Sequence, residues 1–207
     1  MKIKQDEVFG LDKKKDVLQT TTKFDGFDLV EAVYADDVDT VCYAYVVAPY
    51  KNVLFSTLDN GEGKINVVEL DEENYLLCSA KHAMILRIVD NKPYILASVV
   101  ADKPCEMYKA GKFLVDNGLI VLTDYLPDEK RNLQYLFNFK DGKVISSGYD
   151  TIDIVNKKIR ASYGLADGFL DKDGNFILNG DDEEVKKCSF WKRLFRKEDK
   201  VVGRFLR

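Results

Sequence analysis

The sequence predicts an all-β protein, an antiparallel meander of repeated hairpins followed by a short C-terminal amphipathic helix. Three observations predict this fold class. Short polar turns recur between apolar segments, those segments are rich in aromatic and β-branched residues, and Pro is scarce, with 4 among 207 residues. Aromatic and β-branched side chains suit a half-buried pleated surface. The meander is expected to close as a propeller or a barrel, or to stack hairpin upon hairpin.

Length and composition indicate one globular domain with an appendage. The chain is 46% hydrophobic and 32% charged, which is far from the low hydrophobicity of a disordered chain. A chain of this length can bury a sizeable core. We expect a single all-β domain over residues 1–180 and a basic amphipathic helix or tail over residues 181–207.

The turns share one pattern, in which an apolar residue, a short polar turn and two or three apolar residues follow one another. This pattern is typical of strands that pair through hairpins. Asp and Gly suit such turns because Asp bonds to its own backbone and Gly adopts positive φ without steric cost. The copies are LDKKKDVL from Leu11, LDEENYLL from Leu70, VDNKPYIL from Val89, KAGKFLV from Lys109, FKDGKVI from Phe139 and LDKDGNFIL from Leu170.

Strand candidates lie between these turns. Some alternate apolar with polar residues and others are uniformly apolar, which indicates half-buried outer strands beside fully buried ones. No segment before residue 180 shows a sustained helical period. The candidates are TVCYAYVV from Thr40, KINVVEL from Lys64, HAMILRIV from His82, YILASVV from Tyr94, GLIVLTDY from Gly118 and NLQYLFNF from Asn132.

The segment Asp-Lys-Asp-Gly at residues 171–174 invites a calcium-binding interpretation. An EF-hand loop needs oxygen ligands at its first positions, Gly at the sixth and Glu at the twelfth. Placing Gly174 at the sixth position puts Phe169 at the first and Gly180 at the twelfth, and neither is a ligand. We therefore expect Asp171 and Asp173 to be turn residues with a structural role.

Two stretches resemble WG (KWG) repeats, whose pattern couples a glycine-rich hairpin to a following Tyr-Asp and a strand of small residues. Residues 135–178 resemble two successive copies and residues 8–32 a third, although the Trp-Gly pair that names the family does not occur. The resemblance implies a repetitive β structure in a bacterial or phage-associated protein, with binding rather than chemistry as the usual role. The matching residues are Asp141, Gly142, Tyr149, Asp150, Asp171, Gly174 and Ile177, with Phe24 and Asp25 in the early copy.

The sequence carries no cofactor or zinc signature and no segment of about 20 apolar residues that would span a membrane. Its N-terminus lacks the apolar region of a signal peptide. We expect a reduced cytoplasmic protein without a cofactor. The cysteines, which form no C-x-x-C pair, are Cys42, Cys78, Cys105 and Cys188.

The sequence contains few candidate catalytic residues. His82 is the only His, so any Ser-His or Cys-His pair must use it, and Ser79 and Cys78 are the nearest nucleophiles along the chain. No nucleophile-elbow motif accompanies it, so we expect a His that faces solvent at the start of a strand. A pair of carboxylates on a β scaffold stays open as a hydrolase or carbohydrate-active site.

Two further segments invite a ligand-binding interpretation. The acidic run Asp36, Asp37 and Asp39 is expected to form a solvated loop rather than a metal site, because one run does not supply convergent ligands. GEGK at residues 61–64 lacks the phosphate-loop frame and is expected to form another hairpin turn.

The tail has the strongest charge asymmetry in the chain. Its last 22 residues carry nine Lys or Arg against Glu198 and Asp199, a net charge of +7. Because the whole chain has a net charge of −4, the first 185 residues carry −11. A helix from about Asp182 to Lys200 would place apolar residues on one face and basic residues on the other. The candidate partner-binding residues are Trp191, Lys192, Arg193, Phe195, Arg196 and Lys197.

Three roles stay open for this helix: docking on the protein's own acidic β body, binding a partner or another copy, and contacting nucleic acid or an anionic membrane. The absence of cofactor and catalytic motifs and the repetitive architecture favour a non-catalytic protein-binding module of bacterial or phage origin. An inhibitor or immunity-type protein, acting through its β surface and basic tail, is the specific form expected. The alternative is a carbohydrate-active or other hydrolase that uses a carboxylate pair.

Overall fold

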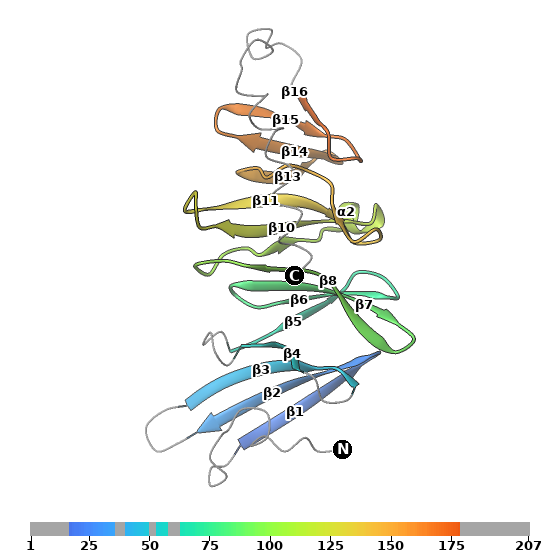
Figure 1. Cartoon of the computed structure of the whole chain (residues 1–207), viewed down its shortest axis with the longest axis vertical. Coiled ribbons are helices and arrows are strands. Elements are labelled where there is room, and N and C mark those ends of the chain that lie inside the picture. The colour runs from blue at the N-terminus through green and yellow to red at the C-terminus, as the bar shows by residue number, and fades with distance from the viewer. Residues whose placement is uncertain (1–16, 36–39, 50–52, 58–62, 179–207) are drawn as a thin grey trace.

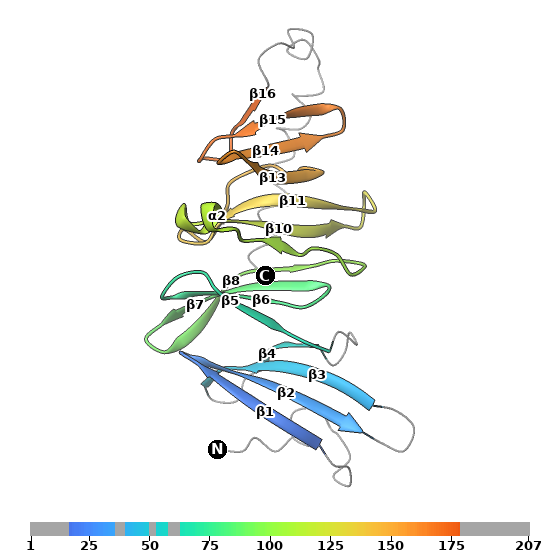
Figure 2. The same ribbon diagram turned by 180° about the vertical axis from the view of Figure 1, so that it is seen from behind.

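The computed structural model describes residues 17–35, 40–49, 53–57 and 63–178, and these form four antiparallel sheets of four strands each. The sheets follow one another along the long axis of the molecule, from the N-terminal sheet to the fourth sheet (Figures 1 and 2). The predicted all-β meander of hairpins is confirmed, and its hairpins stack. The predicted C-terminal helix lies outside the described residues.

Each sheet is a meander in which neighbours in sequence pair. The N-terminal sheet contains β1 (Val17–Phe24), β2 (Phe27–Ala35), β3 (Thr40–Val47) and β4 (Val53–Ser56). The second contains β5 (Asn66–Glu69), β6 (Asn74–Cys78), β7 (His82–Val89) and β8 (Lys92–Val100). The third contains β9 (Tyr108–Lys109), β10 (Leu119–Leu126), β11 (Arg131–Asn138) and β12 (Lys143–Val144). The fourth contains β13 (Thr151–Val155), β14 (Lys158–Tyr163), β15 (Ala166–Leu170) and β16 (Phe176–Leu178).

Tight turns set the hairpin registers. Asp90 and Asn91, both at positive φ, join β7 to β8, and Asn156 and Lys157 join β13 to β14 in the same way. Two consecutive residues at positive φ give a turn whose twist matches that of the flanking strands. The predicted turns beginning at Leu70, Val89, Phe139 and Leu170 each join two strands that pair antiparallel, so they are confirmed as hairpin connections. Residues 11–16 and 61–62 lie outside the described part of the chain.

One predicted turn is wrong. The segment from Lys109 does not form a hairpin but leads into the short helix α2 (Lys112–Asp116), which precedes β10. Gly111 caps the helix in an extended conformation, and Leu114 on its inner side is fully buried. Five residues are too few to show a helical period, so the buried Leu114 stabilises this turn through tertiary packing.

The core lies between the sheets rather than inside any one of them. In the second sheet, Leu76 and Ile85 pack towards the third sheet, while their neighbours Leu77 and Leu86 pack towards the N-terminal sheet. Alternate residues of a strand point to opposite faces, so a sheet with neighbours on both faces needs apolar residues at every position. This confirms the prediction of strands buried on both faces for β7 and for the start of β10. The apolar β8 differs, because it is the edge strand of its sheet and is exposed along much of its length.

Polar side chains fasten adjacent sheets at their margins. The Arg87 guanidinium of β7 donates hydrogen bonds to the carbonyl oxygens of Phe139 and Lys140, both at 2.6 Å. Lys109 of the third sheet donates to the Ile152 carbonyl oxygen at 2.8 Å and to the carboxylate of Asp153 in the fourth. These contacts fix the sheets laterally, which packing of flat apolar faces does not do by itself.

Candidate functional site

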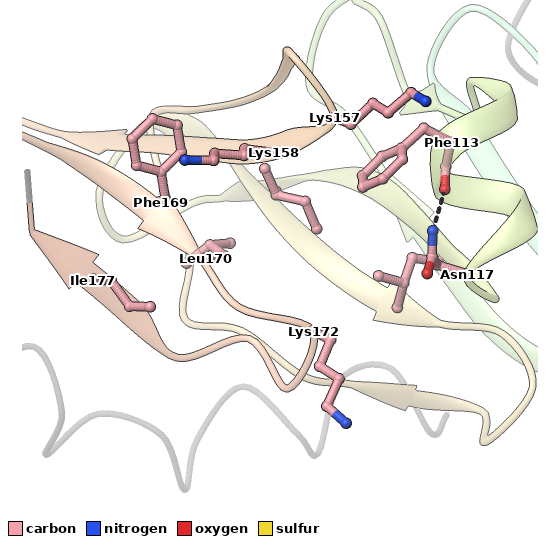
Figure 3. Close-up of a pocket in the computed structure, with 10 residues that line it drawn as sticks. Phe113, Asn117, Lys157, Lys158, Phe169, Leu170, Lys172 and Ile177 are labelled. Atoms are coloured by element: carbon pink, nitrogen blue, oxygen red, sulfur yellow. Dashed lines mark hydrogen bonds between the residues drawn. The ribbon is translucent and has the colours of Figure 1, made fainter.

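A cavity of about 360 Å³ opens where α2 and the start of β10 meet the fourth sheet, and we call it the lysine pocket. Figure 3 shows side chains from the helix on one side and from the fourth sheet on the other. Three lysines and six apolar residues account for all but one of its lining residues. The lining consists of Phe113, Asn117, Leu119, Lys157, Lys158, Ile159, Phe169, Leu170, Lys172 and Ile177.

Two turns of the fourth sheet position the lysines. Lys157 occupies the second position of the β13–β14 turn, with φ 59°, and Lys158 begins β14. Lys172 comes from the β15–β16 turn. Because β14 and β15 are antiparallel neighbours, the turn before β14 and the turn after β15 lie at the same end of the sheet.

The three lysines have no ion pair within the described part of the chain. The ammonium group of Lys158 lies 5.4 Å from the centre of the Phe169 ring, a cation–π contact. The neighbouring cation Arg160 differs, because it forms a two-pronged salt bridge with Asp167, and its hydrogen bonds hold the pKa of the Asp167 carboxyl below its ordinary value. The pocket lining thus carries positive charge that none of its described residues neutralises.

The apolar wall comes from both sides of the junction. Leu119 belongs to the core between the third and fourth sheets, where Phe113 also packs, and Leu170 closes the same core from β15. Ile177 is 54% exposed at the outer edge. The side chain of Asn117 donates a hydrogen bond to the Phe113 carbonyl oxygen at 2.7 Å, which ties down the end of α2 (Figure 3).

This combination of groups suits binding. Ligand pockets are mostly apolar with a few placed polar groups, and volumes of about 300–1,000 Å³ are typical. Among the described residues, the lining supplies cations and apolar surface but neither a hydroxyl or thiol nucleophile nor a carboxylate. An anion that carries an apolar group would pair with the lysines and bury that group against Leu119 and Leu170.

The Asp-Lys-Asp-Gly segment beside the pocket is a turn, as the spacing predicted. Asp171 Oδ1 accepts hydrogen bonds from the backbone N–H groups of Asp173 and Asn175, both at 2.9 Å. The Asn175 side chain donates to Oδ2, and this hydrogen bond is the main cause that holds the pKa of Asp171 below its ordinary value. The carboxylate of Asp171 is therefore engaged in the turn itself.

The same device closes an equivalent turn in the second sheet. Asp71 Oδ1 accepts hydrogen bonds from the N–H groups of Glu73 and Asn74, at 3.0 and 2.8 Å, between β5 and β6. Asn138 does so between β11 and β12, accepting from Lys140 and Asp141. Asx residues thus make hairpin turns in three successive sheets.

His82 differs from its expected placement. It is half-buried rather than solvent-facing, because its ring packs on Phe55 with centroids 4.4 Å apart. Its Nε2 lies 2.8 Å from Ser98 Oγ on the neighbouring strand. The nucleophile nearest in sequence, Ser79, instead directs its hydroxyl to the His82 carbonyl oxygen at 3.4 Å.

Sequence reasoning missed Ser98 because strand register brings it to His82. Met84 pairs with Ser98, and a β-bulge shifts the register of β8 between Ala97 and Ile95. No local motif marks such a contact. Sequence reasoning also missed the lysine pocket, because its residues come from four separate stretches between Phe113 and Ile177. The one local signal was Lys172, which lies in a turn that the sequence did predict.

Several predicted sites lie outside the described residues. These include the six partner-binding residues of the tail, Trp191, Lys192, Arg193, Phe195, Arg196 and Lys197, and the acidic run at residues 36–39. Where the structure describes the chain, no group of three or more His, Cys, Asp or Glu side chains converges as a metal site would require. Within the same ranges, no helix has the length and apolar character needed to cross a membrane.

Comparison with protein-family models, curated proteins and solved structures gave no match to this chain. The resemblance to WG repeats therefore stays a prediction.

Proposed function

We propose that this protein is a non-catalytic binding module for a partner protein, and that the lysine pocket of the fourth sheet is its recognition site. The observation that carries the proposal is the lining, three lysines without an ion pair in the described residues above an apolar wall. A pocket that combines a few placed polar groups with apolar surface can both orient a ligand and bury its apolar part. Action as an inhibitor or immunity protein of bacterial or phage origin is the specific form that the proposal takes.

The position of the pocket supports this role. It lies at the junction of two sheets, so its walls belong to a packed core, while its outer rim is accessible at Ile177 and Lys172. A rigid wall fixes the shape of a site before the ligand arrives and lowers the entropic cost of binding. The basic tail would add a second contact to the same partner, since residues 179–207 follow directly after β16.

Selection from a displayed library of random peptides against the immobilised full-length chain tests the proposal. Selected peptides should bind wild type and lose at least about tenfold in affinity to Ile177→Trp, which fills the rim of the pocket without changing charge. Ile95→Trp is the matched control, because Ile95 is similarly exposed, at 50% against 54%, but lies on β8. Selected peptides that bind wild type and Ile177→Trp equally would contradict the assignment of the pocket.

One observation favours a hydrolase as the second candidate, with a Ser-His pair in place of the carboxylate pair expected from the sequence. A hydroxyl within hydrogen-bond distance of an imidazole is the arrangement of a base-activated nucleophile, and Ser98 and His82 have it. In such an enzyme Ser98 Oγ would attack an acyl or phosphonyl centre and His82 would take the hydroxyl proton. The bond from that centre to its leaving group would then break, with His82 returning the proton to the departing group. Incubation with a fluorophosphonate probe decides between the two functions. A binding module should show no covalent adduct by intact mass, whereas stoichiometric labelling at Ser98 that His82→Gln abolishes would establish the hydrolase.

A further inference from the structure

We infer that the ligand of the lysine pocket is an acidic segment of a partner protein, with an apolar side chain between Asp or Glu residues. This inference rests on the proposed function and names the chemistry of the partner. It follows from the sign and placement of the pocket charges, the chemistry of the wall and the charge of the remaining chain.

The charges come from two separate turns and the first residue of the strand that follows one of them. Lys157 and Lys158 come from the β13–β14 connection and Lys172 from the β15–β16 turn, with Ile159 and Leu170 lining the pocket from the adjoining strands. Figure 3 shows Lys157 and Lys172 extending in different directions around the site. Anionic groups on both sides of an apolar anchor would match this arrangement better than a single terminal anion would.

Lysine ammonium groups act as point charges rather than as planar forks. They pair with carboxylates in many orientations, as the side chains of an extended acidic segment would present them. The acidic residues next to Lys172, Asp171 and Asp173, do not line the pocket, and the Asp171 carboxylate is already engaged by Asn175 and backbone N–H groups. The lysines therefore remain available for carboxylates from outside.

The overall charge of the chain selects against long polyanions. Residues 1–185 carry a net charge of −11, and a negative body repels an extended nucleic acid although it tolerates a short anionic segment at a local cationic site. The cavity, about 360 Å³, lies at the small end of ligand pockets and suits one aliphatic or aromatic side chain. A short acidic peptide with one anchor satisfies both limits.

Three synthetic peptides test the inference with the full-length protein. The first places one Phe between two pairs of Glu, the second replaces every Glu by Gln, and the third replaces the Phe by Ala. We expect the first to bind by fluorescence polarisation and the other two to bind at least about tenfold more weakly. Binding of the first should also weaken as salt rises, because exposed ion pairs are screened.

Charge variants localise the effect. Replacing Lys157, Lys158 and Lys172 together by Gln should weaken binding of the acidic peptide about tenfold, because three exposed ion pairs, each of small energy, are lost together. Replacing Lys92, Lys103 and Lys130 by Gln is the matched control, because it removes the same charge from exposed lysines elsewhere.

The outcomes separate this inference from the proposed function. Equal binding of the Glu and Gln peptides, or equal loss in both triple variants, would overturn the acidic-ligand inference. If library peptides that Ile177→Trp rejects prove neutral or basic, the pocket is a recognition site and the inference about its ligand is wrong. If the acidic peptide binds Ile177→Trp as well as wild type, neither the ligand nor the pocket assignment survives.

Discussion

Replacing Gly174 by Ala should destabilise the protein strongly, because this glycine lies where two sheets touch backbone to backbone. Gly174 has φ +82°, a conformation that L side chains rarely adopt. A Cβ there would lie 2.5 Å from the Ile145 carbonyl carbon and closer still to its oxygen. The β15–β16 turn would have to move away from the third sheet to relieve the overlap.

The magnitude follows from two costs. Placing Ala at left-handed φ costs about 1–2 kcal/mol, and forcing a methyl group into a packed contact adds about 1–3 kcal/mol. Gly164 separates them, because it also has positive φ, +59°, but a methyl group added there would meet no atom within 4 Å. Gly174→Ala should therefore lose about 2–5 kcal/mol of unfolding free energy, and Gly164→Ala about 1–2 kcal/mol.

Urea unfolding followed by circular dichroism at 25 °C measures both variants, and thermal melts should show a decrease in Tm of roughly 5–15 °C for Gly174→Ala. Equal destabilisation of the two variants would refute the reasoning. It would mean that the turn does not dock on residues 145 and 146, and that backbone conformation alone accounts for the effect.

Three further perturbations test other parts of the structure. Arg87→Ala should cost about 1.5–3 kcal/mol in urea unfolding because two carbonyl oxygens lose a charged donor, and a smaller loss than that of an exposed Lys→Ala control would contradict the inter-sheet role. Asp167 and Asp171 have pKa values below the ordinary 3.8. Their contribution to stability is therefore complete above pH 3.8 and is lost as the pH falls through the lower pKa values of the folded state. Thermal melts in acid should show a smaller pH dependence of stability for Asp171→Asn, and an unchanged pH profile would argue against the role of Asp171 in its turn. Deleting residues 186–207 should leave the sheets folded, since the described strands end at Leu178. Light scattering should show that the deletion weakens association with a partner or with another copy of the chain. A large decrease in Tm would instead identify the tail as a cap on the body.

The hairpins could be predicted because their signals are local. A turn such as Asp90-Asn91 or Asp171 to Gly174 is encoded in adjacent residues, and the consecutive apolar residues 75–78 of β6 and 119–122 of β10 indicate that both faces of these strands are covered. Turn chemistry and strand periodicity act over a few residues, so a single sequence contains them. The stacking of sheets follows from strands that are apolar on both faces.

The candidate site could not be predicted because it depends on contacts between distant segments. Lys157 and Phe113 are 44 positions apart, and only the docking of the fourth sheet on the third brings them to one cavity. His82 and Ser98 meet through a register that a β-bulge alters. The short helix α2 escaped prediction for the related reason that Leu114 is held by the core rather than by helix propensity.

Hydrogen exchange of the full-length protein with and without a library-selected peptide tests the central claim most directly, because it locates the bound surface without assuming it. Binding at the lysine pocket predicts slower exchange at α2, at residues 157–159 and at residues 169–172, with little change in the N-terminal sheet. Protection confined to the N-terminal or second sheet, with no change in exchange around Lys157 and Lys172, would contradict the account.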